Sequence, residues 1–183
     1  MTRIAAVVLA AGESTRFGEP KQRLLLPYVI ERLRGSPVDE IVVVEGAHEL
    51  ERTELALGGP PVRIVTADDW ADGPGASLRV GLSSLDDDVA AAVVVLADGP
   101  GLSPQAVERV LGAWRTDGGV AAASYAGARG HPLVVGRRDW GDVPDAGLHE
   151  RPARLVPCDD LGAPGDVDTQ ADLPSGRPPG WQL

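Results

Sequence analysis

Four segments of the chain are almost continuously apolar and lack the alternation of polar and apolar residues that is typical of a half-exposed strand. They are rich in Val and Ala and cover residues 3–10 (RIAAVVLA), 40–46 (EIVVVEG), 62–67 (VRIVTA) and 90–98 (AAAVVVLAD). Strands of this kind are covered on both faces, as in parallel sheets. The pattern therefore predicts parallel strands with helices on both sides.

Helical segments are expected between these strands. We predict a short helix at 28–35 (YVIERLRG), a helix at 47–59 that ends in a glycine pair, and a helix at 75–85 that carries several leucines on one face. The alternation of strand and helix, with right-handed crossovers, predicts an open α/β sheet. Ligands of such sheets bind at the carboxyl ends of the strands.

The second half of the chain has a different pattern. Residues 103–115 predict a helix with Ser103 as its N-cap, and residues 118–136 predict a strand, a turn and a returning strand. The sheet is therefore expected to be mixed there. We expect residues 136–165 to form loops around the site, and residues 174–183 (PSGRPPGWQL) to be a tail after a single domain at 1–173.

Composition and charge limit the partners. Hydrophobic residues make up 43% of the 183 residues but aromatic residues only 4%, so the core must consist mainly of Val, Leu and Ala. The net charge of -10 argues against a broad surface for nucleic acid or for an acidic membrane. Cys158 has no second cysteine to pair with, and the sequence shows no signal peptide and no long apolar run, so we expect a cytoplasmic, soluble protein.

The connection after the first strand is basic and rich in small residues. It reads LAAGESTRFGEPKQ (9–22), and its spacing matches neither a P-loop nor a GxGxxG turn. Small residues allow backbone N–H groups to approach an anion, while Arg16 and Lys21 supply positive charge. We therefore expect this loop to bind phosphate; the alternative is a surface turn with two solvated cations.

Acidic residues provide a second candidate site. Asp98 ends a buried strand, where a carboxylate is costly unless it meets a cation or lies at the edge of the sheet. Mg²⁺ is bound by one or two carboxylates together with substrate phosphates, and Asp166 or Asp168 would provide the second carboxylate. The alternative for these two residues is an acidic turn that caps a helix at Thr169.

Five stretches in order resemble one family. LAAGESTRFGEPKQ matches the LAAGxSxRxGxxK signature of nucleotidyltransferases similar to molybdenum cofactor cytidylyltransferase and molybdopterin guanylyltransferase. The other four stretches resemble the W-x-x-G and SL-x-x-GL, LADQP, GHP and DIDTPEDL segments of that family, and they are DDWADGPGASLRVGLSSL (68–85), VLADGPGLS (95–103), GARGHPLVV (127–135) and GDVDTQADL (165–173).

The resemblance implies a fold and an activity. The fold would be a Rossmann-like, mostly parallel sheet of the nucleotide-diphospho-sugar transferase type, mixed in its C-terminal half. The activity would be Mg²⁺-dependent transfer of a nucleoside monophosphate from CTP, or less favourably from GTP, to a phosphorylated acceptor, with release of pyrophosphate. The implied acceptor is molybdopterin, and a molybdoenzyme or its maturation factor is a further implied partner.

The resemblance also implies roles for individual residues. The catalytic residues would be Arg16, Lys21 and Asp98, and the metal ligands Asp98 and Asp168, with Asp166 as a further candidate. His131 would contact the substrate, although it could equally be a turn histidine beside Pro132. The nucleotide would be bound by Leu9, Ala10, Ala11, Gly12, Arg16, Lys21, Gly75, Ser77 and Leu78.

The sequence departs from the family pattern at three places. Gly99 and Gly101 flank Pro100 where the family has a larger side chain, the helix after KQRLLLPY is expected to be short, and HERPAR (149–154) replaces a GDxGAR-like segment. Arg151 and Arg154 of that segment are candidates for a phosphate contact. Two alternatives stay open. Related folds serve many substrates, so the acceptor could be a sugar phosphate or another small phosphorylated molecule. The departures themselves favour a non-catalytic nucleotide-binding or cofactor-insertion partner.

Overall fold

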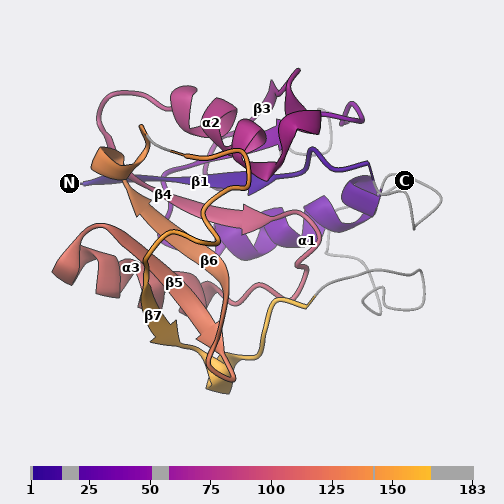
Figure 1. Cartoon of the computed structure of the whole chain (residues 1–183). Coiled ribbons are helices and arrows are strands. Elements are labelled where there is room, and N and C mark those ends of the chain that lie inside the picture. The colour runs from indigo at the N-terminus through magenta and orange to yellow at the C-terminus, as the bar shows by residue number, and fades with distance from the viewer. Residues whose placement is uncertain (1, 14–20, 51–57, 142, 166–183) are drawn as a thin grey trace.

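A computed structural model describes residues 2–13, 21–50, 58–141 and 143–165, except for the side chain of Lys21. The described residues form one seven-stranded sheet in the order β3-β2-β1-β4-β6-β5-β7 (Figure 1). The strands are β1 (Arg3–Leu9), β2 (Glu40–Glu45), β3 (Val62–Thr66), β4 (Val89–Leu96), β5 (Val120–Tyr125), β6 (Ala128–Gly136) and β7 (Arg154–Pro157). All four predicted apolar strands are therefore present.

The sheet is parallel on one side and mixed on the other. β3, β2, β1 and β4 run parallel, β6 is antiparallel to β4 and to β5, and β7 is parallel to β5. The chain proceeds from β1 outward to β2 and β3, and then returns to the other side of β1 as β4. This reversal creates a topological switch point between β1 and β4, where ligands of open α/β sheets bind.

Helices cover both faces of the sheet, as the buried strands require. One face of β1, with Ile4, Ala6 and Val8, packs under α1 (Lys21–Arg34) and α3 (Pro104–Asp117). The other face, with Ala5 and Val7, packs under α2 (Pro74–Ser83) and under a segment that contributes Val143 and Leu148. Figure 1 shows α2 on the opposite side of the sheet from α1 and α3. Leu78 and Leu82 of α2 are buried in the same cluster as Leu85, which lies just after the end of the helix, so the predicted leucine face is present.

The helix after the first loop differs from the prediction. α1 has 14 residues and contains Pro27, whereas the sequence predicted a short helix at 28–35. A proline normally ends a helix, but Leu25, Leu26 and Val29 on both sides of it are buried and hold this helix against the sheet. Of the helix expected at 47–59, residues 47–50 are not helical, and 51–57 lie outside the described residues. No helix in the described part of the chain has the length and apolarity needed to cross a membrane.

Two other predictions need correction. Ser103 precedes α3 as expected, but its hydroxyl donates to Gln105 Oε1 at 2.9 Å and caps no backbone N–H group. Residues 136–165 are not all loops, because β7 joins the sheet edge beside β5. β7 has four residues, of which only Val156 is buried, so it leaves no periodic signal in the sequence.

The contact between α2 and the sheet can be tested at Gly81. A Cβ at this position would lie 2.6 Å from Val7 Cγ1 and 2.9 Å from Val44 Cγ2. We expect Gly81→Ala to lower the free energy of unfolding by about 1–3 kcal/mol through overpacking, as measured by chemical denaturation. Gly112→Ala on α3 is the matched control, because no atom lies within 4 Å of its added Cβ, and it should raise stability by about 0.5–1 kcal/mol. Equal effects of both substitutions would contradict this packing.

Candidate functional site

The loop after β1 starts at the switch point and is held there by its neighbours. Ala97 N–H donates to Leu9 O at 3.0 Å, and Ala10 N–H donates to Val44 O at 2.9 Å. Ala10 and Ala11 are buried, whereas Gly12 is exposed. The predicted residues Leu9, Ala10, Ala11 and Gly12 therefore lead from the sheet edge outward to solvent.

The first turn of α1 lies at the same edge. Gln22 Nε2 donates to Gly12 O at 2.7 Å, which ties the helix start to the loop. Lys21 is the first residue of this helix, but its side chain, like the whole of Arg16, lies outside the described residues. Leu9 and Leu96 are paired residues, so the loop after β1 begins at the same edge of the sheet as the end of β4. Because Gln22 ties the start of α1 to this loop, the backbone of Lys21 lies at that edge as well.

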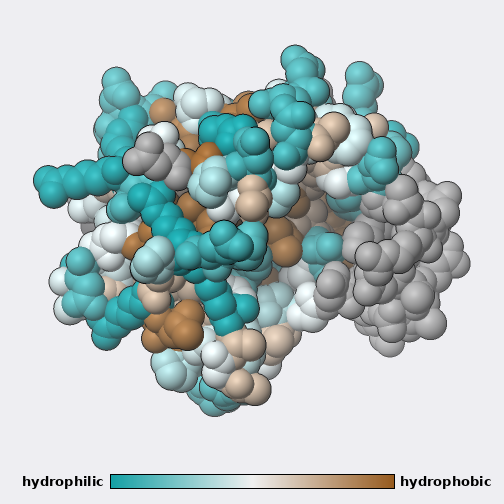
Figure 2. Space-filling model, viewed as in Figure 1, coloured by the Kyte–Doolittle hydropathy of each residue, from teal (hydrophilic) through white to brown (hydrophobic). Residues whose placement is uncertain are grey.

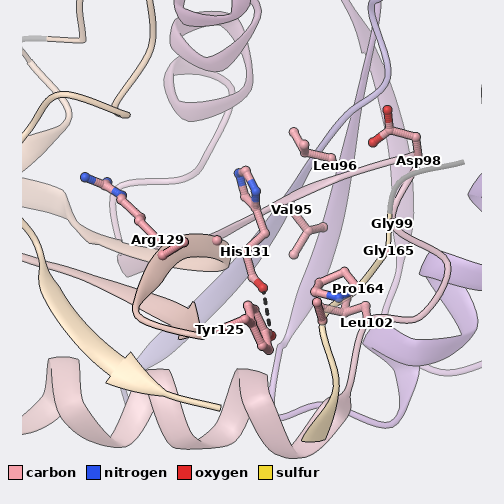
Figure 3. A pocket seen from close by; sticks show the side chains of 13 residues that line it. Val95, Leu96, Asp98, Gly99, Leu102, Tyr125, Arg129, His131, Pro164 and Gly165 are labelled. Atoms are coloured by element: carbon pink, nitrogen blue, oxygen red, sulfur yellow. Dashed lines mark hydrogen bonds between the residues drawn. The ribbon is translucent and has the colours of Figure 1, made fainter. Parts of the chain in front are cut away.

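Asp98 follows β4 and lines a pocket of about 390 Å³. Figure 3 shows that this pocket lies among side chains from the ends of β4, β5 and β6. Most of its lining is apolar or backbone, and the space-filling view shows a hollow with apolar residues among a mostly hydrophilic surface (Figure 2). The lining residues with polar side chains are Asp98, Tyr125, Arg129 and His131.

His131 is uncharged at neutral pH. Burial lowers the pKa of its imidazole to about 4, and the nearby Arg129 adds to this effect while Asp98 opposes it. The Tyr125 hydroxyl donates to His131 O at 3.0 Å and so helps to fix the backbone at this position. Burial also raises the pKa of Tyr125 to about 12. A neutral His131 can donate or accept a hydrogen bond with a bound molecule, but it carries no charge that would attract an anion.

Arg129 lines the pocket and donates to backbone carbonyls through Nη1, whereas its Nη2 is buried and has no hydrogen-bond partner among the described residues. Arg129 Nη1 donates to Arg151 O at 2.5 Å and to His149 O at 3.3 Å. Arg151 in turn pairs with Asp139, with Nη2 and Oδ1 3.2 Å apart, and Arg154 pairs with Asp117. Arg151 and Arg154, considered as phosphate contacts from the sequence, therefore stabilise the segment around β7.

The two glycines that depart from the family pattern have a packing role. Gly101 N–H donates to Pro164 O at 2.8 Å, and a Cβ on Gly101 would lie 2.7 Å from that oxygen. A Cβ on Gly99 would lie 3.0 Å from Pro164 Cβ. The glycines thus allow residues 163–165 to cross the loop after β4, and Gly165 lines the same pocket as Asp98 (Figure 3). Asp166 and Asp168 follow directly and lie outside the described residues.

The start of α2 carries the other predicted nucleotide-binding residues. Gly75 N–H donates to Asp145 O at 2.9 Å, and a Cβ on Gly75 would clash with Pro144 O. Leu78 is part of the core, and Ser77 is buried. Packing thus accounts for Gly75 and Leu78, and their contact with a nucleotide stays a prediction.

Two residues of the loop's surroundings were not identified from the sequence as anchors. Gln22 contacts Gly12 O as described, and His48 Nε2 lies 3.0 Å from Glu13 O. His48 follows β2, the parallel neighbour of β1, and the carboxyl ends of such neighbours meet at one edge. The sequence could therefore predict that the segments after β1 and β2 lie close together, but not which side chain joins them.

Asp98 alone does not complete a metal site at the end of β4, and phosphates of a bound ligand would have to supply further oxygen ligands. Among the described residues, no group of three or more His, Cys, Asp or Glu side chains is placed to hold a metal ion. Asp98 is half-buried at the strand exit and offers carboxylate oxygens, the ligand type that Mg²⁺ prefers. Since Mg²⁺ commonly binds through one or two carboxylates plus phosphates and waters, this donor set fits a cation that arrives with a phosphorylated ligand.

Comparison with known proteins identifies related structures. Residues 6–157 match the family model of the MobA-like NTP transferase domain. Rv0371c from Mycobacterium tuberculosis H37Rv is 30% identical, with a TM-score of 0.75, over 93% of this chain and 96% of that chain. Its homologue from Mycobacterium sp. strain JC1 is 30% identical, with a TM-score of 0.71, over 93% of each chain. No curated protein sequence matches this chain.

A more distant structure shows the fold alone. The 4-diphosphocytidyl-2C-methyl-D-erythritol synthase from Anaerococcus prevotii DSM 20548 is 15% identical, with a TM-score of 0.66, over 93% of this chain and 94% of that chain. The predicted Rossmann-like sheet of the nucleotide-diphospho-sugar transferase type, mixed in its C-terminal half, is thereby confirmed.

The ionisation of His131 gives a prediction about acid stability. Its pKa of about 4 lies below the ordinary value of 6.5, so the unfolded chain binds more protons between these pH values. His131 should therefore reduce the free energy of unfolding as pH falls from about 6.5 to 4. We expect NMR titration to give a midpoint near pH 4, and Asp98→Asn to lower it further because an attractive charge is lost. A midpoint near 6.5 would contradict the burial of the ring.

Proposed function

Because the chain belongs to the family of MobA-like NTP transferase domains, we propose that it transfers a nucleoside monophosphate from a nucleoside triphosphate to a phosphorylated acceptor. An oxygen of the acceptor phosphate attacks the α-phosphorus, the bond from the α-phosphorus to the bridging oxygen breaks, and pyrophosphate leaves with the electron pair. CMP is the favoured group and molybdopterin the favoured acceptor, and a molybdoenzyme or its maturation factor would receive the product. The observation that carries the proposal is the position of the 9–13 loop and Asp98 at one switch point.

The nucleotide half of the site is assigned to the β1 exit. The backbone from Leu9 to Gly12 would approach the triphosphate, and Arg16 and Lys21 would neutralise its charge. Gly75, Ser77 and Leu78 at the start of α2 would lie toward the base. Little covalent chemistry is required of these groups, because positioning and charge stabilisation account for much of the catalysis of phosphoryl transfer.

A divalent cation, in the first place Mg²⁺, is assigned to Asp98 and Asp168. Rv0371c in complex with manganese is 29% identical to this chain, with a TM-score of 0.67, over 93% of this chain and 96% of that chain, and it supports a divalent cation here. Such a cation would neutralise charge on the phosphates. Asp98 itself contributes a carboxylate held at the end of a rigid strand.

The acceptor half is assigned to the pocket around His131. Val95, Leu102 and the ring of Tyr125 offer apolar surface, and the Tyr125 hydroxyl is already bonded to His131 O. This surface favours an acceptor with a flat ring system that can pack against it, such as a pterin, over a non-planar sugar phosphate. The amino group and ring nitrogens of a pterin would still need hydrogen-bond partners among the polar side chains and backbone groups of the pocket.

A pyrophosphate-release assay tests this function. With Mg²⁺ and molybdopterin we expect release from CTP, less from GTP, and none with sugar phosphates in place of molybdopterin. Asp98→Ala should reduce turnover at least about 100-fold, because the cation that would offset transition-state charge loses a carboxylate ligand, while circular dichroism stays unchanged. Release with a sugar phosphate alone would reject the acceptor. Nucleotide binding without release for any acceptor would favour a binding module.

Lys21 provides a separate test of the triphosphate assignment. Lys21→Ala should weaken CTP binding in the presence of Mg²⁺ by about tenfold or more, since one charge-assisted hydrogen bond contributes about 1.5–3 kcal/mol. Isothermal titration calorimetry measures this change. Arg32→Ala, in the last turn of the same helix, is the control and should bind CTP normally. Normal CTP affinity of Lys21→Ala would remove Lys21 from the site.

A further inference from the structure

Three consecutive carbonyl groups of the β1 loop are held by different parts of the chain. Ala47 N–H donates to Ala11 O at 3.1 Å, and Gln22 Nε2 donates to Gly12 O at 2.7 Å. His48 Nε2 lies 3.0 Å from Glu13 O. Because a carbonyl oxygen only accepts, this histidine nitrogen must carry a proton, as it does in one neutral tautomer and in the imidazolium. One donor comes from α1 and two come from the connection after β2.

The contacts at Ala11 O and Gly12 O determine where the Gly12 and Glu13 N–H groups point. In a planar trans peptide the C=O and N–H bonds point in opposite directions. Because Ala11 O points toward the N–H of Ala47, the Gly12 N–H of the same peptide points away from Ala47. Because Gly12 O points toward Gln22, the Glu13 N–H points away from Gln22. Among the described residues, neither of these N–H groups donates to a protein acceptor. Successive N–H groups of this kind can form an anion-binding concavity.

Packing alone does not explain the side-chain anchors. Gly12 and Glu13 are exposed, so water could satisfy their carbonyls at little cost. The orientation of these peptide groups, in contrast, strongly affects the binding of an anion, because a reversed peptide would present a carbonyl oxygen to the anion instead of an N–H group. The anchors therefore have more influence on ligand binding than on the stability of the fold.

We infer that Gln22 and His48 are positioning residues for the 11–13 segment, whose Gly12 and Glu13 N–H groups face the triphosphate. Gln22 sets the direction of the Glu13 N–H through Gly12 O, and His48 holds the far end of the segment at Glu13 O, while the backbone of Ala47 sets the direction of the Gly12 N–H. This inference rests on the proposed function, since it takes a nucleoside triphosphate as the ligand of the loop. Neither side chain is assigned a contact with the nucleotide. Their effect is transmitted through the two carbonyl groups that they bind.

Equilibrium binding of CTP and of inorganic tripolyphosphate, each with Mg²⁺, tests this inference by calorimetry. Gln22→Met keeps a similar volume but removes the donor. His48→Asn leaves a nitrogen near the Nδ1 position only, whereas His48→Gln can place an amide N–H near the Nε2 position. Loss of one neutral hydrogen bond, about 1 kcal/mol, corresponds to about fivefold weaker binding. We expect that loss for Gln22→Met and His48→Asn with both ligands, and recovery to within about twofold for His48→Gln.

The control is Arg23→Ala. Arg23 neighbours Gln22 and donates to Glu49 O at 2.9 Å, after the same strand as His48, but it forms no hydrogen bond with residues 11–13 of the described chain. It should bind both ligands as the wild type does. Hydrogen exchange of the 9–13 segment supplies a second readout: tripolyphosphate should protect it in the wild type and in His48→Gln, but less in His48→Asn.

The outcomes separate this inference from the proposed function. If the wild type binds both ligands and the Gln22 and His48 variants bind them equally well, the positioning role is wrong and the proposed function stands. Weaker binding of CTP with unchanged binding of tripolyphosphate would also overturn the inference, since the effect would then concern the base. If the wild type binds neither ligand, both proposals fail.

Discussion

β1 and β4 pair in parallel up to Leu9 and Leu96, so the connections that follow these two strands begin at the same edge of the sheet. The exit of β1 becomes the basic loop and α1, while the exit of β4 becomes Asp98 and the Gly-Pro-Gly turn. The two faces of β1 pack under different helices, so a slip by one residue would move Ala5 and Val7 from the side of α2 to the side of α1 and α3. The relative position of the loop and Asp98 is thus a consequence of strand register.

Close approach of backbone segments supports this edge of the sheet. A Cβ on Gly46 would lie 2.7 Å from both Ala11 Cβ and Trp70 Cβ, so the chain after β2 can pass directly beside the loop. Gly75 and Gly101 similarly admit the segments around Pro144 and Pro164. Contacts between backbones leave fewer rotatable side chains near the site. A site that works by positioning benefits from such a surrounding, since small displacements of reacting groups reduce the rate strongly.

The sequence predicts those features that leave a local pattern. Continuous burial of β1 is visible in RIAAVVLA, and the cost of a charge at the end of a buried strand identifies Asp98. The start of α1 could not be predicted, because Pro27 is tolerated only through burial of its neighbours against the sheet. The contact between His48 and Glu13 joins residues 35 positions apart and has no periodicity. The pocket around His131 likewise requires the antiparallel placement of β6 beside β4.

Charge is distributed unequally between the two halves of the site. The β1 side carries cationic residues in a chain whose net charge is -10, whereas on the β6 side His131 is neutral and Arg129 is bound to backbone carbonyls. Two anionic phosphates that must react repel each other, so cations are most useful where the larger polyphosphate lies. In the proposed assignment, the pocket around His131 would then recognise the uncharged part of the acceptor by shape and hydrogen bonds. Asp98 lies at the boundary of the two halves, where a divalent cation would offset charge on both phosphates at once.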